Sequence, residues 1–482
     1  MNATAVSGAN TVGPAPPTRT ARWLLTALII IQFFPIPPLP GLGFAPENFI
    51  FLATGLYMMR RFMRMLAQDR RLMQLIMLFL AYAMLRMFHN LIHSVGAIVP
   101  FEHLRTVVFI LALAYVGADE VMLRKLIKLM LIIAVVQVVS GLLIYVFGSP
   151  FADIRNWMLR VNVNEAFISK GSQLAGLYGP PHKLSYLLAA VPVLSITMFL
   201  LERRLVWLGW MFLMLLGLFI NAERAAMGAL TICALMLVWK TSRALSSVLL
   251  VAVVALGVLG VQQVVGLLSA DSQQFGSAYS HGTLGERLGE TSAGEIISRI
   301  AYSFGGVSSV LRHPLIGPSR ADYVREALGK GASELVSGKE REDTLASHNH
   351  YVNIGVNAGV LGWVVGLWFL LTLWRMRRIA VERYRRNRPG YILHCGIALA
   401  LLAALMNAFF HNAGIFSPDL MTSFLIGLLI ADYRLSLRSM PREQVIDDAA
   451  IESAEPGRES RIGSSSVEQS GGRRLTPNQS GS

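Results

Sequence analysis

Two histidines at the start of a long apolar run are the first residues whose type and spacing suggest chemistry. Residues 347–366 have the sequence SHNHYVNIGVNAGVLGWVVG. His348 and His350 are acid/base candidates because histidine titrates near neutral pH. A His-x-His pair can also bind a metal, but no further ligands stand at a convincing spacing, so we expect neither a metal nor another cofactor. His411 and Asn412 repeat the His–Asn dipeptide on another predicted turn, where we expect a supporting role.

The same segment has two different faces if it forms a helix from about Asn349. Asn349, Asn353 and Asn357 recur at every fourth position and make a polar stripe. Asparagine inside a bilayer is costly unless it faces protein or water, so we expect Asn349 and Asn353, together with His350, to contact a substrate. A nearly opposite stripe consists of glycines, which allow another helix to approach closely: Gly355, Gly359, Gly362 and Gly366.

The composition indicates that membrane helices position these residues. Of the 482 residues, 54% are hydrophobic and only 15% are charged, whereas soluble globular proteins carry about 25% charged residues. The mean hydropathy is +0.52. Repeated apolar runs predict an all-α, polytopic membrane protein of about twelve transmembrane helices.

The net charge of +14 has a different meaning in such a chain than in a soluble one. A soluble protein with this charge would suggest a nucleic-acid partner. Here the arginines cluster between the apolar runs, as the positive-inside rule requires, so we expect membrane lipids and no nucleic acid as partners. Cys233 and Cys395 both fall within predicted spans, and the sequence contains no disulfide framework.

The distribution of charge divides the chain into five predicted parts. Residues 269–347 contain ten acidic residues against eight Lys or Arg, although the whole chain is basic, so this segment is predicted to be one large outer loop. The parts are a disordered cytoplasmic N-terminus (1–18), helices one to nine (19–268), the partly helical outer loop (269–347), helices ten to twelve (348–433) and a disordered cytoplasmic tail (434–482).

One arginine contradicts the charge bias. Arg224 lies in NAERAAM, at the outer start of the predicted eighth span, where the positive-inside rule predicts few arginines. It can snorkel to the headgroups or pair with Glu223. Alternatively it binds an anion, because a guanidinium near a helix N-terminus suits phosphate.

The outer loop contains a second group of arginines, in the segment EIISRIAYSFGGVSSVLRHPLIGPSR. Its apolar residues recur at helical spacing, which predicts an amphipathic helix lying on the membrane or over the spans. Arg299 lies within this pattern, and Arg312 and Arg320 follow it. Each of them is either a solvated surface charge or a contact to an anionic substrate.

Taken together, these motifs resemble the signature of the O-antigen ligase-like superfamily. His348–Asn349, nine residues, and then Gly359-x-x-Gly362 resemble its histidine motif. GLYGPPHKLSYLLA, NAERAAMGAL and SRIAYSFGGVSSVLRHPLIG resemble further segments, and the predicted topology also agrees. The superfamily includes lipopolysaccharide O-antigen ligases, Wzy-type polysaccharide polymerases and bacterial O-oligosaccharyltransferases.

The resemblance implies an inverting, metal-independent glycosyltransferase of the bacterial inner membrane, with its active site facing the periplasm. A polyprenyl-diphosphate-linked glycan would be the donor, and a glycan or lipid A-core hydroxyl the acceptor, alongside other polysaccharide-assembly proteins. Carried over by motif, His348 is the general base, Arg224 and Arg299 bind the diphosphate, and His350 contacts substrate. Ligase and polymerase remain open alternatives. The rival from another class is a transporter or flippase of lipid-linked glycans, which predicts charges or interrupted helices near the middle of the bilayer, in paired halves.

Overall fold

The computed structural model describes thirteen stretches of the chain. They are residues 17–34, 46–93, 99–148, 151–159, 174, 176–177, 181–221, 223–241, 293–319, 321–323, 326, 349–417 and 419–438. Within these residues the regular structure is α-helical and contains no strand. The prediction of an all-α protein is therefore confirmed at the level of fold class.

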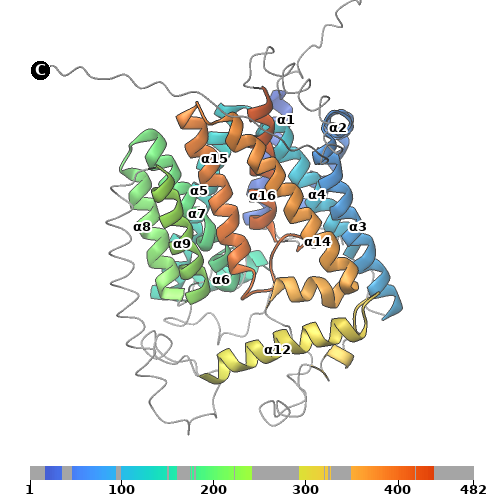
Figure 1. The fold of residues 1–482 in the computed structure, drawn as a ribbon. Coiled ribbons are helices and arrows are strands. Elements are labelled where there is room, and N and C mark those ends of the chain that lie inside the picture. The colour runs from blue at the N-terminus through green and yellow to red at the C-terminus, as the bar shows by residue number, and fades with distance from the viewer. Residues whose placement is uncertain are drawn as a thin grey trace, which may run out of the picture. The chain divides into compact units, whose positions relative to one another are not determined.

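The helices are arranged along the chain as Figure 1 labels them. They are α1 (Arg19–Phe33), α2 (Pro46–Gln68), α3 (Arg70–Ile92), α4 (Val99–Val116), α5 (Glu120–Phe147), α6 (Phe151–Leu159), α7 (Pro181–Glu202), α8 (Val206–Asn221), α9 (Arg224–Thr241), α12 (Ala293–Arg312), α14 (His350–Arg383), α15 (Arg388–Asn407) and α16 (Leu420–Arg438). Side-chain caps fix several of the starts: Asp69 accepts from the first turn of α3, and Asn387 accepts from that of α15.

Seven of the described helices are long and apolar enough to cross a membrane. They are α3, α5, α7, α9, α14, α15 and α16, and α8 is a shorter apolar helix. These helices indicate a multi-pass membrane protein. Helices α1, α2 and α4 do not meet this criterion, and residues 246–268, the last part of the predicted helices one to nine, lie outside the described residues.

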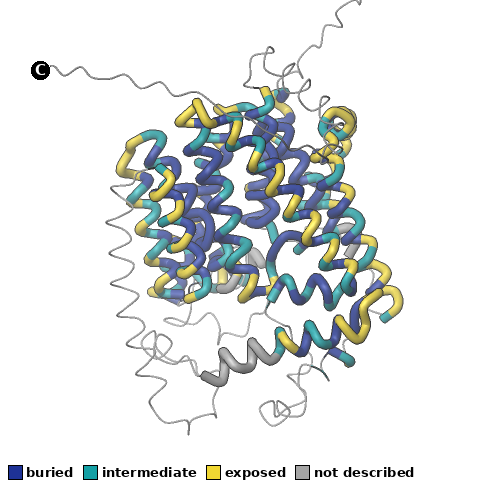
Figure 2. Tube along the Cα trace, viewed as in Figure 1, coloured by how far each residue is buried: buried dark blue, intermediate teal, exposed yellow. Residues whose placement is uncertain are grey.

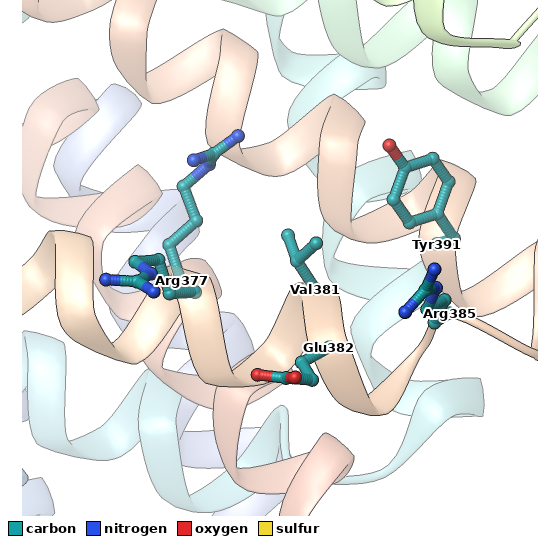
Figure 3. Close-up of a pocket in the computed structure, with 6 residues that line it drawn as sticks. Arg377, Val381, Glu382, Arg385 and Tyr391 are labelled. Atoms are coloured by element: carbon teal, nitrogen blue, oxygen red, sulfur yellow. The ribbon is translucent and has the colours of Figure 1, made fainter. Parts of the chain in front are cut away.

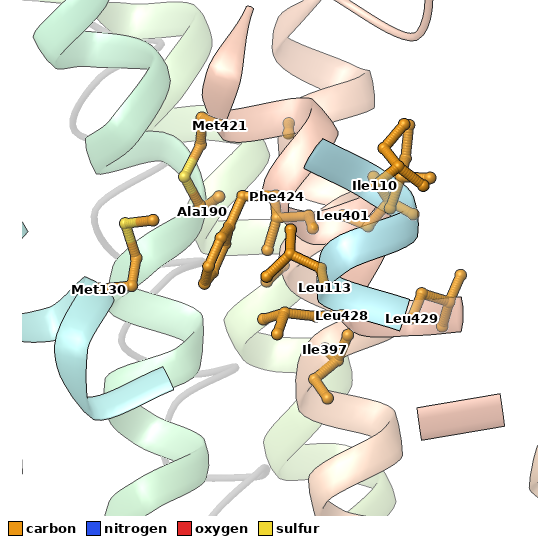
Figure 4. Packing of buried hydrophobic residues seen from close by; sticks show 14 of the residues in the cluster. Ile110, Leu113, Met130, Ala190, Ile397, Leu401, Met421, Phe424, Leu428 and Leu429 are labelled. Carbon is orange, nitrogen blue, oxygen red and sulfur yellow. The ribbon is translucent and has the colours of Figure 1, made fainter. Parts of the chain in front are cut away.

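The buried core joins helices that are far apart in sequence. The last helix, α16, packs against α4, while α15 packs against α7 and α9. Figure 4 shows Leu113 of α4 beside Phe424 and Leu428 of α16, and all three are fully buried. In Figure 2 the outward faces of many helices are exposed, and these faces carry large apolar residues such as Phe212. Outward apolar faces of this kind suit lipid better than water.

A buried ionisable pair, which sequence reasoning missed, ties α15 to α16. His394 Nδ1 lies 2.5 Å from Asp432 Oδ2, and neither side chain is exposed. The Tyr384 hydroxyl, just beyond α14, donates to Asp432 Oδ1 over 3.3 Å. Charged groups inside a membrane protein are costly unless they pair in this way.

Helix α14 is broken, and the prediction of one continuous helix with two regular faces is wrong. Gly359 has φ 67° and ψ −165°, which separates residues 350–358 from residues 360–383. The Val360 N–H donates to Pro314 O, outside α14, over 2.8 Å. A Cβ at position 359 would lie 2.4 Å from Pro314 O, so only glycine fits. Figure 1 shows the two parts pointing in different directions.

The glycines therefore serve a fold-back within α14. The Trp363 ring covers Gly355, where a Cβ would lie 2.4 Å from the ring, and Trp363 Nε1 donates to Tyr351 O over 2.9 Å. A Cβ on Gly362 would meet Ile354 O at 2.7 Å. The close packing predicted for these glycines thus joins the two parts of one helix. Gly366 is less confined, because a Cβ added there would have its nearest neighbours at 3.7 Å.

Candidate functional site

A turn after α12 holds the break in α14. We call residues 313–317 the α12 turn. Gly317 has φ 90°, and a Cβ there would lie 2.4 Å from Val356 O, so the turn presses directly on the backbone before the break. His89 Nδ1 of α3 lies 2.9 Å from Ile316 O, and Nε2 of His93, the residue that directly follows α3, lies 3.3 Å from Gly317 O. Because a carbonyl only accepts, both rings donate to the turn.

His350, the first residue of α14, is buried with one ring nitrogen unpaired. Its side chain is 4% exposed, and its ring lies against Gly414. Nδ1 lies 3.3 Å from Asn412 O, so in the neutral ring this nitrogen carries the proton. Nε2 then keeps its lone pair, and it has no hydrogen-bond partner among the described residues. In this tautomer, Nε2 is the nitrogen that can accept a proton.

The second His–Asn dipeptide joins the elements around His350. Asn353 Nδ2 donates to Asn412 Oδ1 over 2.7 Å. His411 Nε2 lies 3.5 Å from Glu223 Oε2, directly before α9, and its ring centroid lies 5.1 Å from that of Tyr186 on α7. The starts of α7, α9 and α14 therefore converge on residues 411–412, which sequence reasoning had assigned only a supporting role.

Arg224 lies where the sequence predicted it, at the first position of a helix. It begins α9, and its side chain is exposed. The preceding residue, Glu223, faces His411. The path from Arg224 through Glu223 and His411 to Asn412 connects this arginine with the His350 region.

Arg86 is a residue that sequence reasoning missed. It lies near the end of α3, and its guanidinium is close enough to act electrostatically on His350. Its Nε is buried and has no hydrogen-bond partner among the described residues. The sequence could have indicated this role. Like Arg224, Arg86 lies at the end of a predicted span that is opposite to the end with the clustered, cytoplasmic arginines.

The three asparagines of the predicted stripe contact protein groups. Asn349 is not helical but caps α14, accepting from Tyr351 N over 3.0 Å. Asn353 binds Asn412, and Asn357 lies near the Tyr82 hydroxyl of α3. Contacts with other parts of the protein therefore reduce the free-energy cost of placing these asparagines in a bilayer.

The remaining predicted site residues differ in how much the structure says about them. Arg312 forms an ion pair with Glu326 while its side chain stays largely exposed. Arg299 lies within α12, but its side chain is outside the described part of the chain. His348 and Arg320 also lie outside the described residues.

A buried arginine binds a part of the chain that precedes α7. Arg155 of α6 is 1% exposed and donates from Nε to Gly176 O over 2.9 Å. Burial lowers the pKa of this guanidinium to about 10. Gln137 of α5 accepts from Leu177 N over 2.6 Å, so this stretch of chain is fixed from two sides.

The described residues contain no group of three or more His, Cys, Asp or Glu side chains arranged to hold a metal ion. Comparison with protein-family models gives no match, and comparison with curated proteins gives none either.

Proposed function

We propose that this protein is a glycosyltransferase of the bacterial inner membrane, with about twelve spans. It would transfer a glycan from polyprenyl diphosphate to an acceptor hydroxyl on the periplasmic side, in surface polysaccharide synthesis. The observation that carries the proposal is the buried His350, two residues after His348, which is joined through residues 411–412 to Glu223 beside Arg224. The resemblance of the His348 motif to O-antigen ligases supports the same reaction class.

The proposed reaction needs a base and a stabiliser of negative charge. A neutral histidine, His348 by motif, takes the proton of the acceptor hydroxyl as its oxygen attacks the anomeric carbon. The bond from that carbon to the diphosphate breaks on the opposite face, so the configuration inverts. The departing lipid diphosphate keeps the electron pair, and Arg224 and Arg299 stabilise its charge. His350 and Arg86 would act beside the base, on the acceptor.

The experiment is an analysis of surface glycans from a deletion strain, with and without the gene restored. Bare core with accumulated lipid-linked glycan indicates a ligase. One repeat on the core without long chains indicates a polymerase of O-antigen, and loss of a secreted polymer alone indicates an exopolysaccharide polymerase. Glycans that match the parent strain in all three respects contradict the proposal.

The buried His394–Asp432 pair gives the transporter alternative a specific observation of its own. A proton-coupled transporter would need this pair to titrate. Asp432→Asn should then abolish movement of lipid-linked glycan across reconstituted vesicles. A transferase would keep its chemistry in the same variant once the protein is folded.

A further inference from the structure

A basic pocket lies at the end of α14 opposite to His350. Its volume is about 500 Å³, and Figure 3 shows the residues that line it: Arg377, Arg378, Val381, Glu382, Arg385 and Tyr391. All come from α14 and the segment after it except Tyr391, which belongs to the first turn of α15. In Figure 3, Arg377 and Tyr391 extend to the same side of the two helices. The pocket therefore lies where α14 turns back into α15.

The lining carries three cations against one carboxylate, Glu382. The Arg377 guanidinium also stacks over Trp374, 4.7 Å from the ring centroid. Lys240, near the end of α9, adds a further positive charge to this end of the bundle, where α9 packs against α15. Positive charge from separate helices is thus concentrated at one place. Guanidinium groups in such an arrangement suit a phosphate, which accepts paired hydrogen bonds from the planar fork.

The pocket also continues a lipid-facing stripe of α14. Leu367, Leu371, Trp374 and Arg378 follow one another at spacings of four, three and four, so they share one face of the helix. The first three are 61%, 45% and 54% exposed. Exposed leucines of a membrane helix meet acyl chains, and a tryptophan beyond them is typical of the headgroup level. An amphiphile on this face would have its tails along the leucines and its headgroup at Arg378.

We propose that this pocket binds the phosphate headgroup of an anionic membrane lipid in the leaflet at the basic end of the bundle. Basic pockets between transmembrane helices bind anionic headgroups in this way. The proposal concerns a site separate from the His350 region, and it stands whether or not the protein transfers glycans.

The test measures the binding of fluorescent phosphatidylglycerol to the full-length protein in phosphatidylcholine nanodiscs. The pocket variant is Arg377→Gln with Arg378→Gln. Its matched control is Arg375→Gln with Arg386→Gln, which removes two exposed arginines of the same basic region that do not line the pocket. General surface attraction loses about fivefold in affinity per arginine. The affinity of the control pair should fall by no more than about fivefold for each arginine removed. The affinity of the pocket pair should fall at least tenfold further than that of the control pair.

A neutral variant separates a built site from surface charge. Tyr391→Phe removes one hydroxyl and no charge, and it should weaken lipid binding about fivefold if that hydroxyl contacts the phosphate. Equal losses in the two double variants, with Tyr391→Phe unchanged, would overturn the pocket. A monodisperse profile in size-exclusion chromatography shows for each variant that the protein is folded.

The source of the phosphate is distinguished in a second arm with inorganic phosphate. It should not displace the fluorescent lipid at concentrations far above that of the protein, because it lacks the acyl chains that lie on α14. Displacement by inorganic phosphate alone would overturn the lipid assignment, since the pocket would then serve a soluble phosphate compound.

Discussion

At the scale of single residues, the orientation of one imidazole ring carries most of the chemical argument. The Asn412 carbonyl fixes the His350 proton on Nδ1 and leaves Nε2 as the acceptor. In the sequence, His348 directly precedes Asn349, the cap residue of α14, and His350 is the first residue of that helix. Only the motif favours His348, and the two are separable by substitution.

His348→Ala should lower the rate of glycan transfer by about 10²–10⁴-fold, because the acceptor loses its general base. The rate is measured with membranes that contain equal amounts of the protein. His313→Ala, which changes an exposed histidine of the α12 turn, is the control and should keep most activity. Full activity of His348→Ala combined with loss in His350→Ala would transfer the role of base to His350.

Arg224→Ala and Arg86→Ala should each reduce transfer by about 10²-fold or more while the protein still inserts into the membrane. Each removes positive charge close to the His350 region, where the diphosphate leaving group needs it. Arg203→Ala is the matched control, because Arg203 is an exposed arginine in the link between α7 and α8. Normal transfer by Arg224→Ala would remove this arginine from the mechanism.

At the scale of elements, the break in α14 depends on a partner far away in sequence. Gly359 accepts a left-handed backbone because Pro314, in a different segment, supplies its carbonyl to Val360 N. The α12 turn is itself held by His89 of α3 and by His93, which directly follows α3. The short part of α14 that carries His350 is thus positioned by α3 and the α12 turn together.

Gly359→Ala should destabilise the protein by about 2 kcal/mol or more, because it combines a left-handed backbone with a clash against Pro314 O. Thermal unfolding in detergent measures the loss, and transfer activity should fall with it. Gly366→Ala is the control in the same helix, since its Cβ would meet only ordinary contacts at 3.7 Å. Equal stability of the two variants would mean that the break is not needed.

At the scale of the whole molecule, the two ends of α14 differ in chemistry. The end with His350 gathers histidines, asparagines and few arginines, whereas the other end enters a strongly basic region with the pocket around Arg377. The proposed histidine mechanism at the first end uses no metal. Transfer should therefore survive EDTA in washed membranes, and activity that is lost with EDTA and restored by a divalent ion would contradict the histidine mechanism.

Much of this organisation could be predicted from local sequence. Apolar runs gave the all-helical membrane class, and Arg224 was expected at a helix start, where α9 begins. The break at Gly359 could not be predicted, because its cause is a carbonyl 45 residues earlier in the chain, and its glycine also fitted a regular stripe. The joining role of His411–Asn412 was missed for the same reason, since Glu223 and Asn353 are distant in sequence.

The break also changes the hydrophobic length that α14 offers to the bilayer. Only residues 360–374 form an uninterrupted apolar stretch before the arginines begin. At 1.5 Å per residue this stretch is about 22 Å long, which is shorter than the hydrocarbon thickness of about 30 Å. The membrane beside α14 is therefore expected to thin by several ångströms. A lipid-linked molecule beside α14 would therefore move a shorter distance out of the hydrocarbon to reach His350 than it would if the bilayer kept its full thickness there.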